Sequence, residues 1–359
     1  MSSYQAHFPE NPLHDAFLAI RAAQPCMSLA DMAALLRVTE EELLLGSGAS
    51  VFALGADWPR IVRALPALGL ITFSSGNALV RHEQAGTVDA VSLSGRRMRV
   101  YGKGIKLRID LASARQAFYV QGNINHPHRH GIYFFDAEGG CRLRMMLMDE
   151  APAPRAGLTP GADLPEPASR RLMRIPTVAV PTLSPAQRQA FIADWGVMQG
   201  ADDFNILLLQ HGLSERQALQ LAAPVYTHRL EHESVLCLLR AAAQTQLPLH
   251  VTTHGHGIDQ SHRGLIPPLC LLQQPLHPGK PRLSLQLCQD AFSETWLVRR
   301  PAQGGICTTV EMFDRAGRCA LRMADGSALS HAETEEWREL AEDLPALADC
   351  LRPAPRMSR

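Results

Sequence analysis

Alternating apolar and polar positions predict long runs of β-strand in two separate parts of the chain. The first run begins near residue 71 and continues to about 148, and the second begins at 249–253 and continues to about 323. Since successive strand side chains point to opposite faces, this period of two indicates half-buried sheets. Before each run, apolar residues recur at the spacing of an α-helix. The pattern therefore predicts an α+β protein of two lobes, each with helices followed by a large antiparallel meander.

The predicted helices occur in a similar order in both halves. Residues 28–47 are expected to form two short helices, with Thr39 as an N-cap and Glu42 completing a capping box. Residues 57–68 carry proline at an early helical position, and Gly69 follows them as a stop signal. The helices predicted in the second half are 184–204, 206–221, 234–243 and 332–350.

One strand–turn–strand segment occurs twice. FFDAEGGCRLRM at 134–145 returns as MFDRAGRCALRM at 312–323, a constant 178 residues later in a chain of 359. The same offset aligns apolar positions over about 76–145 and 254–323. This period predicts a duplicated domain, because it is far too long for a solenoid repeat. We expect two repeats at 1–150 and 184–359, joined by a linker at 151–183 that is rich in Pro, Ala and Arg.

Charge and composition narrow the classes of function. Lys+Arg and Asp+Glu balance at 35 each, so no net charge attracts nucleic acid or an anionic membrane. No apolar run approaches the roughly 20 residues of a membrane-spanning helix, and the N-terminus lacks the features of a signal peptide. The eight cysteines include no CxxC pair, which is typical of buried thiols in a reducing compartment. We therefore expect a cytoplasmic protein without membrane insertion.

The helix pair at 28–47 allows a second interpretation, because its spacing resembles a helix-turn-helix DNA-binding module. Its second helix would present Glu40, Glu41 and Glu42 to phosphate, where a recognition helix needs Lys, Arg, Asn or Gln. The second half also has a helix pair at the equivalent place. The sequence thus favours a packing role and no nucleic-acid partner, with transcriptional regulation as the alternative.

Histidine is the chemically informative residue, with fifteen copies in the chain. Two clusters stand out: His126, His128 and His130, and His254, His256 and His262. Alternating histidines on a strand share a face and can bind a metal. However, neither cluster has a carboxylate partner at ligand spacing, and the chain has no HExxH, GxSxG, P-loop or GxGxxG motif. We interpret both clusters as solvated side chains, with a dedicated metal site as the alternative.

A series of motifs in fixed order points to a known family. The motifs are LADMAALLRVTEEELL, ALVRHEQAG at 78–86, KLRIDL at 106–111, FFDAEG at 134–139, WGVM at 195–198 and SETWLVRRP at 293–301. Together they resemble the haemin-degrading factors, the HemS/HmuS type of bacterial haem-utilisation protein. The resemblance covers nearly the whole chain, including the duplication. It implies a haem-binding cleft between one sheet and a cluster of second-half helices.

The resemblance also implies residues of the haem site. Arg108 matches the arginine that approaches the iron from the distal side, and His82, in the HEQ-x-G motif, matches a second haem contact. Arg300 matches a lysine that meets a propionate, and either residue supplies a cation for a carboxylate. The column of the usual proximal histidine holds Asp202 instead.

The loss of that histidine changes the expected iron ligation. A carboxylate is a harder and poorer donor to haem iron than a neutral imidazole. Met198 would lie one helical turn before Asp202 on the same face, and its thioether can ligate iron. His82 and Met198 are therefore the metal ligands we predict. Further candidates, less well oriented, are His211, His228 and His232.

The sequence thus predicts a cytoplasmic haem-binding protein of bacterial haem uptake, which carries haem or assists its degradation to release iron. The alternative is a non-enzymatic paralogue with the same fold and weak or altered ligand binding. A haem importer and a haem oxygenase are the partners that the resemblance implies. Because Arg108 aligns with Gln286 and His82 with Gln260 at the repeat offset, one cleft drawing on both halves is expected rather than two equivalent sites.

Overall fold

The computed structural model describes residues 11–25, 27–77, 79–102, 105–121, 130–148, 158, 183–231, 233–267, 283–288, 292–327 and 333–344. Most of the predicted linker at 151–183 lies outside this set, as do His126, His128 and His232.

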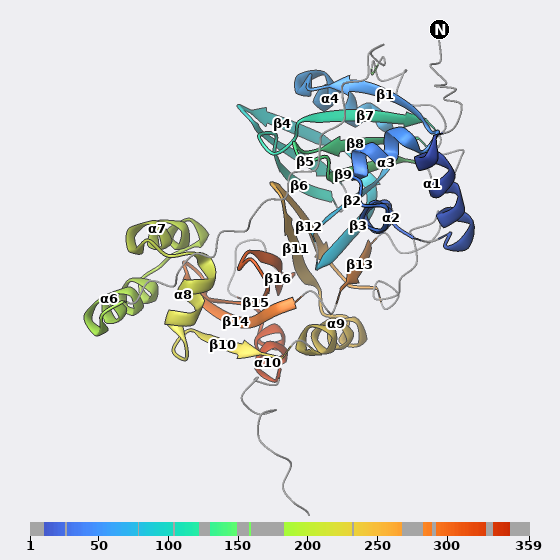
Figure 1. The fold of residues 1–359 in the computed structure, drawn as a ribbon. Coiled ribbons are helices and arrows are strands. Elements are labelled where there is room, and N and C mark those ends of the chain that lie inside the picture. The colour runs from blue at the N-terminus through green and yellow to red at the C-terminus, as the bar shows by residue number, and fades with distance from the viewer. Residues whose placement is uncertain are drawn as a thin grey trace, which may run out of the picture.

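Within the described residues, the chain folds into two antiparallel sheets with helices packed against them (Figure 1). The α+β prediction is therefore confirmed. Across the first sheet, the strands follow the order β1 (Ser50–Gly55), β7 (Gln116–Gln121), β8 (Gly131–Phe135), β9 (Cys141–Leu147), β2 (Leu70–Gly76), β3 (Val80–Thr87) and β13 (Leu283–Leu287).

The second sheet has nine strands and is the larger one. Their order across it is β10 (Thr227–Leu230), β14 (Phe292–Ala302), β15 (Gly305–Asp314), β16 (Cys319–Asp325), β11 (Leu249–Gly255), β12 (Ile258–Gly264), β6 (Ile105–Asp110), β5 (Arg97–Gly102) and β4 (Ala90–Ser94).

The repeated sequence segment has the same geometry in both copies. It forms the β8–β9 hairpin in the first half and the β15–β16 hairpin in the second. Both hairpins contain a register shift at matching places, after Phe134 and after Met312. Both turns place a glycine in the left-handed region, Gly139 at φ 74° and Gly317 at φ 76°, where a side chain would be strained. The sequence identity between the copies thus preserves a backbone shape.

The two halves exchange strands in a symmetric way. First-half strand β6 pairs with β12, and its repeat equivalent β13 crosses over to pair with β3. Both pairings keep the same register, since Leu107 lies opposite Gln260 just as Leu285 lies opposite His82. Each sheet therefore contains strands from both sides of the predicted linker. The proposed domain boundaries at 150 and 184 remain a prediction about the chain, while the sheets themselves are shared.

Polar pairs related by the repeat join the two sheets. The hydroxyl of Ser75 donates to Oε1 of Gln260 at 2.7 Å, and the equivalent pair joins His82 Nδ1 and Thr253 Oγ1 at 3.1 Å. His82 has no exposed surface, and burial, followed by the charge of nearby His262, lowers its pKa from 6.5 to about 3. His82 is thus a neutral interior residue in the position that glutamine fills in the other half.

We expect this buried histidine to make the protein sensitive to acid. The unfolded chain binds a proton at His82 below about pH 6.5 and the folded protein does so only below about pH 3, so the free energy of unfolding falls as pH decreases through this window. His82→Gln should remove up to about 1.4 kcal/mol per pH unit of that slope, measured by urea denaturation between pH 6.5 and 4.5. Gln260→His, which places the second histidine at the equivalent buried position, should steepen the slope. Parallel pH profiles for all three proteins would contradict this account.

The helices of the first half follow the predicted capping signals. α2 (Leu29–Leu36) and α3 (Glu40–Gly46) are the two short helices, and the capping box between Thr39 and Glu42 is confirmed. α4 (Trp58–Ala64) continues into a 3₁₀ turn, η1 (Leu65–Leu68), before Gly69. α1 (Pro12–Ala23) and the edge strand β1 were not predicted.

The acidic start of α3 packs into the protein body. Glu41 is fully buried and receives two hydrogen bonds from Arg115 at 2.5 and 2.7 Å, as well as one from Gln116. Leu43 and Leu44 enter a core cluster beneath β7 and β8. The packing interpretation of the 28–47 segment is therefore confirmed. Glu41 is held inside the protein by Arg115 and does not project from α3 as a recognition residue would.

The helices before the second meander differ from the prediction. Instead of two helices at 184–204 and 206–221, the structure has α6 (Pro185–Gly196), α7 (Ala201–His211) and α8 (Glu215–Ala222). α6 ends at Gly196, and Gly212, in the left-handed region at φ 63°, ends α7. The predicted boundaries were wrong because the apolar periodicity of the sequence continues across the ends of these helices. α9 (Glu233–Thr245) and α10 (Glu335–Glu342) match the other two predictions in position.

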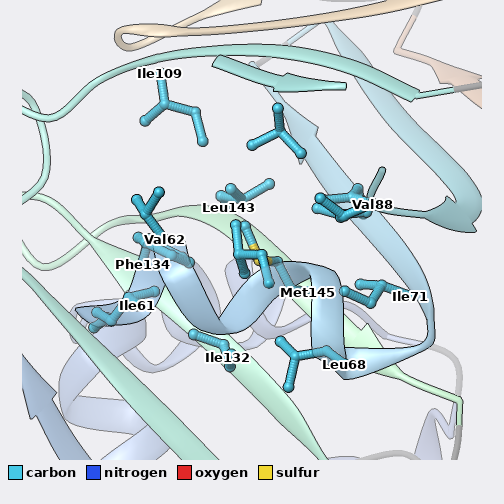
Figure 2. Packing of buried hydrophobic residues seen from close by; sticks show 14 of the residues in the cluster. Ile61, Val62, Leu68, Ile71, Val88, Ile109, Ile132, Phe134, Leu143 and Met145 are labelled. Atoms are coloured by element: carbon cyan, nitrogen blue, oxygen red, sulfur yellow. The ribbon is translucent and has the colours of Figure 1, made fainter. Parts of the chain in front are cut away.

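Apolar cores hold the helices onto the sheets. In the first half, Ile61, Val62 and Leu68 from α4 and η1 pack on buried side chains of β8 and β9 such as Phe134 and Met145 (Figure 2). In the second half, α9 and α10 cover one face of the nine-stranded sheet, and α6, α7 and α8 cover part of the opposite face. In Figure 1 the last three helices lie together at the left, below the edge formed by β4, β5 and β6.

Candidate functional site

A cavity in the described residues lies beside the α6–α7 turn. It has a volume of about 420 Å³, within the range of roughly 300–1,000 Å³ typical of small-molecule sites. Gln199 of the turn, His250 of β11 and Arg263 of β12 line it, together with the β14–β15 hairpin at 302–308. The backbone N–H of Gln303 donates to the carbonyl of Gln199 at 3.1 Å and so ties the hairpin to the turn. The cavity therefore lies between the helix layer and the nine-stranded sheet.

A positively charged sheet surface adjoins this cavity. We call it the basic face, and it consists of Arg99, Lys106, Arg108 and Arg263. Residues opposite one another in antiparallel strands share a face, and Arg108 lies opposite both Arg99 and Asp259, while Arg263 lies opposite His250. Arg99, Lys106 and Arg108 are exposed. The basic face thus continues from Arg263 at the cavity to cations on β6 and β5, two strands of the first half.

His250 presents an uncharged imidazole to the cavity. Burial, then Arg263 and Lys106, with smaller contributions from His262 and Arg108, lower its pKa from 6.5 to about 4. Its single hydrogen bond within the described residues joins Nε2 to the hydroxyl of Thr252 at 3.5 Å, the long limit for such a contact. At neutral pH the ring therefore retains a lone pair for another partner.

The helix layer supplies an apolar wall with exposed side chains. Its interior contains Trp195, Phe204 and Met198, which pack on Trp296 and Val298 of β14. Three other apolar residues remain in solvent: Val197 is 74% exposed, Ile206 50% and Leu209 83%. Val197 directly follows α6, and Ile206 and Leu209 lie at helical spacing on α7; such exposed apolar side chains can form part of a ligand-binding surface. We call these three residues the apolar ridge.

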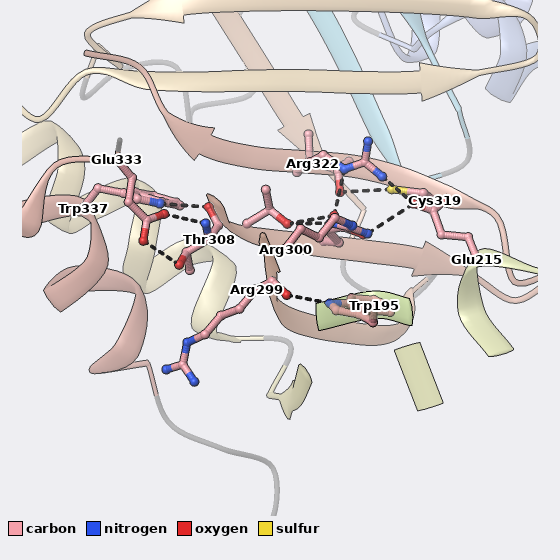
Figure 3. A network of polar contacts seen from close by, with 12 residues as sticks. Trp195, Glu215, Arg299, Arg300, Thr308, Cys319, Arg322, Glu333 and Trp337 are labelled. Carbon is pink, nitrogen blue, oxygen red and sulfur yellow. Dashed lines mark hydrogen bonds and ion pairs between the residues drawn. The ribbon is translucent and has the colours of Figure 1, made fainter. Parts of the chain in front are cut away.

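Beneath the helix layer lies a buried ion-pair network (Figure 3). Glu311, with no exposed surface, accepts from Arg300 at 2.5 Å and from Nε of Arg322 at 2.8 Å. Burial alone would raise the pKa of Glu311, but Arg300 and Arg322 lower it well below its usual range. Glu215 at the start of α8 pairs with Arg322 and lies 3.7 Å from Arg300. The network thus joins α8 to three strands.

Part of this network has the spacing of metal ligands. Glu215, Glu311 and Cys319 are the group of ligand atoms close enough to hold an ion among the described residues. The two carboxylates are already neutralised by Arg300 and Arg322, and burial raises the pKa of the Cys319 thiol well above its ordinary value. A protonated thiol is a poor metal ligand. The donor set therefore fits a salt-bridge network better than a metal centre.

The structure places the predicted site residues in three separate environments. Arg108 lies on the basic face, and His82 lies buried between the two sheets. Arg300 lies under the helix layer, where its guanidinium stacks 4.2 Å from the Phe204 ring while pairing with Glu311. Only Arg108 is therefore accessible from the cavity side in this conformation. The roles of His82 and Arg300 as haem contacts remain predictions.

The predicted relation between Met198 and Asp202 is wrong. Met198 lies in the turn after α6, whereas Asp202 lies in the first turn of α7, so no continuous helix places them on one face. Met198 is 5% exposed and packs with Trp195, and Asp202 is exposed. On α7, Asp202 shares its face with Ile206 and Leu209 at helical spacing. Met198 and His82 as metal ligands remain predictions.

Of the described histidines in the two clusters, His256 is exposed, and the other three contact neighbouring side chains. His130 stacks on Tyr119 with ring centroids 5.8 Å apart. His254 Nδ1 lies 2.8 Å from Asp259, and His262 Nδ1 lies 3.1 Å from Gln84. His254 does have a carboxylate partner, which sequence spacing did not reveal, but none of these rings belongs to the one candidate metal group in the described residues.

Comparison with known proteins identifies the family. A model of the haemin-degrading HemS.ChuX domain matches residues 37–151 and 212–344. The chain belongs to this family. Each of the two matched segments contains one copy of the repeated strand–turn–strand segment, 134–145 or 312–323.

Individual family members match over almost the whole length. The hemin transport protein HemS of Yersinia enterocolitica is 25% identical over 91% of this chain and 95% of its own. The structure of holo-PhuS, a heme-binding protein from Pseudomonas aeruginosa, has a TM-score of 0.81 at 29% identity and covers 94% of this chain and 99% of that one. The heme degrading enzyme ChuS of Escherichia coli O157:H7 shares the fold, with a TM-score of 0.76 at 21% identity, 93% of this chain and 98% of its own.

Sequence reasoning missed several residues of this candidate site. It did not single out His250, Arg263, Arg99 or Lys106, and it did not anticipate the apolar ridge. The alternation of apolar and polar residues could have indicated the three cations, because Arg99, Lys106 and Arg108 alternate with buried residues of β5 and β6. His250 gave no such signal, since it is one of several histidines on alternating strands.

Proposed function

We propose that this chain binds haem for bacterial haem utilisation, carrying it or assisting its degradation so that iron is released. The observation that carries the proposal is a 420 Å³ cavity whose lining residue Arg263 belongs to the basic face, on the side of the nine-stranded sheet that the helix layer partly covers. A haem molecule has two carboxylates and a broad apolar ring, so it suits cations next to apolar side chains. Similarity to haem-binding relatives over the whole chain supports the same ligand.

Each part of the site has a distinct role under this proposal. Arg108, Lys106 and Arg263 offer cations to the propionates, since charge-assisted hydrogen bonds to carboxylates are among the stronger polar contacts. Val197, Ile206 and Leu209 offer apolar surface to the porphyrin. Haem itself carries the oxidative chemistry of any degradation, and the protein holds and orients it. A haem importer as donor and a haem oxygenase as acceptor, both meeting this protein in the cytoplasm, complete the proposal.

Titration with haemin tests the proposal directly. We expect a saturable Soret shift at one equivalent for the wild-type protein. Arg108→Ala should weaken the apparent affinity about tenfold or more, because a hydrogen bond between charged groups contributes roughly 1.5–3 kcal/mol. Arg63→Ala is the matched control, since Arg63 is an exposed arginine on α4, which packs on the face of β5 and β6 opposite the basic face. Spectra identical to those of free haemin would contradict haem binding.

A second experiment separates carriage from degradation. Ascorbate added to the haem complex should leave the Soret band in place for a carrier, and it should bleach the band and release iron for a degrading protein. Asp202, in place of the family's usual histidine, is the observation that favours the paralogue alternative, weak or altered binding. If the wild-type protein binds haemin no more tightly than the Arg108→Ala variant does, the result supports the paralogue with weak or altered binding.

Among the described residues, no helix is both long enough and apolar enough to cross a bilayer.

A further inference from the structure

His250 occupies the position from which a side chain of the sheet can reach a ligand in the cavity. It lies on β11, with Arg263 of β12 and Ala324 of β16 directly opposite on either side. All three line the same cavity, and Gln199 lines it from the helix layer. His250 therefore faces the turn that precedes Asp202, across the space proposed for haem.

His256 is exposed and lines a different cavity, and the remaining described histidines contact partners elsewhere. Within that part of the chain, His250 is the histidine that lines this cavity. His211, a candidate from the sequence, pairs with Asp194 at 2.9 Å and packs against Phe191. Partners also hold His14 (Ser47 carbonyl), His82 (Thr253), His130 (Tyr119), His254 (Asp259) and His262 (Gln84). His228 lies opposite Leu297, a residue of the α9–α10 core, and thus on the far face of the sheet.

The chemistry of the ring suits iron. A neutral imidazole is the commonest protein ligand of haem iron, and the ligating nitrogen must be unprotonated. Burial, and then the charges of Arg263 and Lys106, lower the pKa of His250 and so disfavour the imidazolium form. Thr252 holds the ring only weakly at 3.5 Å, so iron can replace this contact at little cost.

We propose that His250 supplies the axial nitrogen ligand to haem iron from the sheet side, in place of the helix histidine whose position Asp202 occupies. This inference rests on the proposed function, since it concerns how the same site holds haem. It assigns the ligand to a strand of the second half and leaves Asp202 on α7 outside the iron's coordination.

Resonance Raman spectroscopy of the full-length protein, loaded with one equivalent of haemin and reduced, tests the assignment. The wild-type complex should show the iron–histidine stretching band of a haem with an imidazole ligand. His250→Gly should lose this band, and added imidazole should restore it by occupying the space left by the side chain. His254→Ala, on the same strand and face four residues away, should keep the band. His250→Gln provides a variant of similar size, and it should also lose the band.

The outcomes separate this inference from the function on which it rests. A wild-type protein that gives the spectrum of free haemin overturns both. A wild-type complex whose band survives in both His250 variants overturns the His250 assignment alone and leaves haem binding in place. Circular dichroism establishes that the variants fold. If the band is lost only in His254→Ala, the ligand is His254 and the assignment is wrong.

Discussion

Replacing Glu311 with alanine is expected to lower the free energy of unfolding by about 3–5 kcal/mol, because it leaves two arginines without their buried partner. Glu311 is fully buried, and it accepts from Arg300 at 2.5 Å, Arg322 at 2.8 Å and the Thr309 hydroxyl at 2.8 Å. Arg300 is only 12% exposed, so water cannot replace the carboxylate fully. Urea denaturation followed by circular dichroism measures the loss.

A surface pair provides the matched control for Glu311. Glu342 accepts from Arg299 at 2.7 Å, but these side chains are 43% and 30% exposed. Glu342→Ala should therefore cost no more than about 1 kcal/mol. The double variant Glu311→Ala, Arg300→Ala should cost less than the sum of the single changes, since each partner alone leaves an unpaired charge. Equal losses for Glu311→Ala and Glu342→Ala would contradict the role of burial.

The duplication makes this network informative about function. The repeat equivalent of Glu311 is Tyr133, which is also buried, and the equivalent of Arg322 is Arg144. The same fold is therefore built in the first half with a neutral side chain at this position. The carboxylate is a feature of the half that carries the helix layer and the cavity. Because Glu311 has no acidic equivalent in the first half, the network agrees with a single site rather than two equivalent ones.

The sequence was sufficient for the elements whose signals are local. The capping box of Thr39 and Glu42 and the glycine turns at Gly139 and Gly317 were visible because the interacting residues lie within a few positions of one another. The exchange of β6 and β13 between the two sheets was not visible in the sequence. Alternation in IKLRID shows that the strand has two faces, but it does not say which neighbour it pairs with.

The same limit applies to the site. Arg108 was found through the resemblance, whereas the cavity itself joins Gln199, His250 and residues near 305, which are far apart in the sequence. The helix boundaries failed for a physical reason as well. Gly196 and Gly200 interrupt an apolar period that otherwise continues, so Met198 was assigned to a helical face that does not exist.

Replacing Trp195 with alanine is expected to destabilise the protein by about 3–5 kcal/mol and to abolish haemin binding with it. Trp195 is fully buried at the end of α6, stacks on Tyr226 with centroids 5.8 Å apart and packs edge-on against Phe204 at 5.3 Å. Its indole N–H donates to the carbonyl of Arg299 at 3.0 Å and so fixes α6 to β14 (Figure 3). Because the turn carrying Gln199 begins there, loss of the ring should release one wall of the cavity.

Two further variants separate stability from the site. Phe73→Ala removes a fully buried ring from the core of the first sheet and should cost a similar 3–5 kcal/mol, yet it should leave haemin titration close to that of the wild-type protein. Trp195→Phe retains most of the packing but loses the hydrogen bond to Arg299, and it should retain part of the affinity. Urea denaturation and Soret titration of the same samples measure both effects. If Phe73→Ala and Trp195→Ala lose haemin affinity equally, global destabilisation explains the result and the helix layer has no specific role in the site.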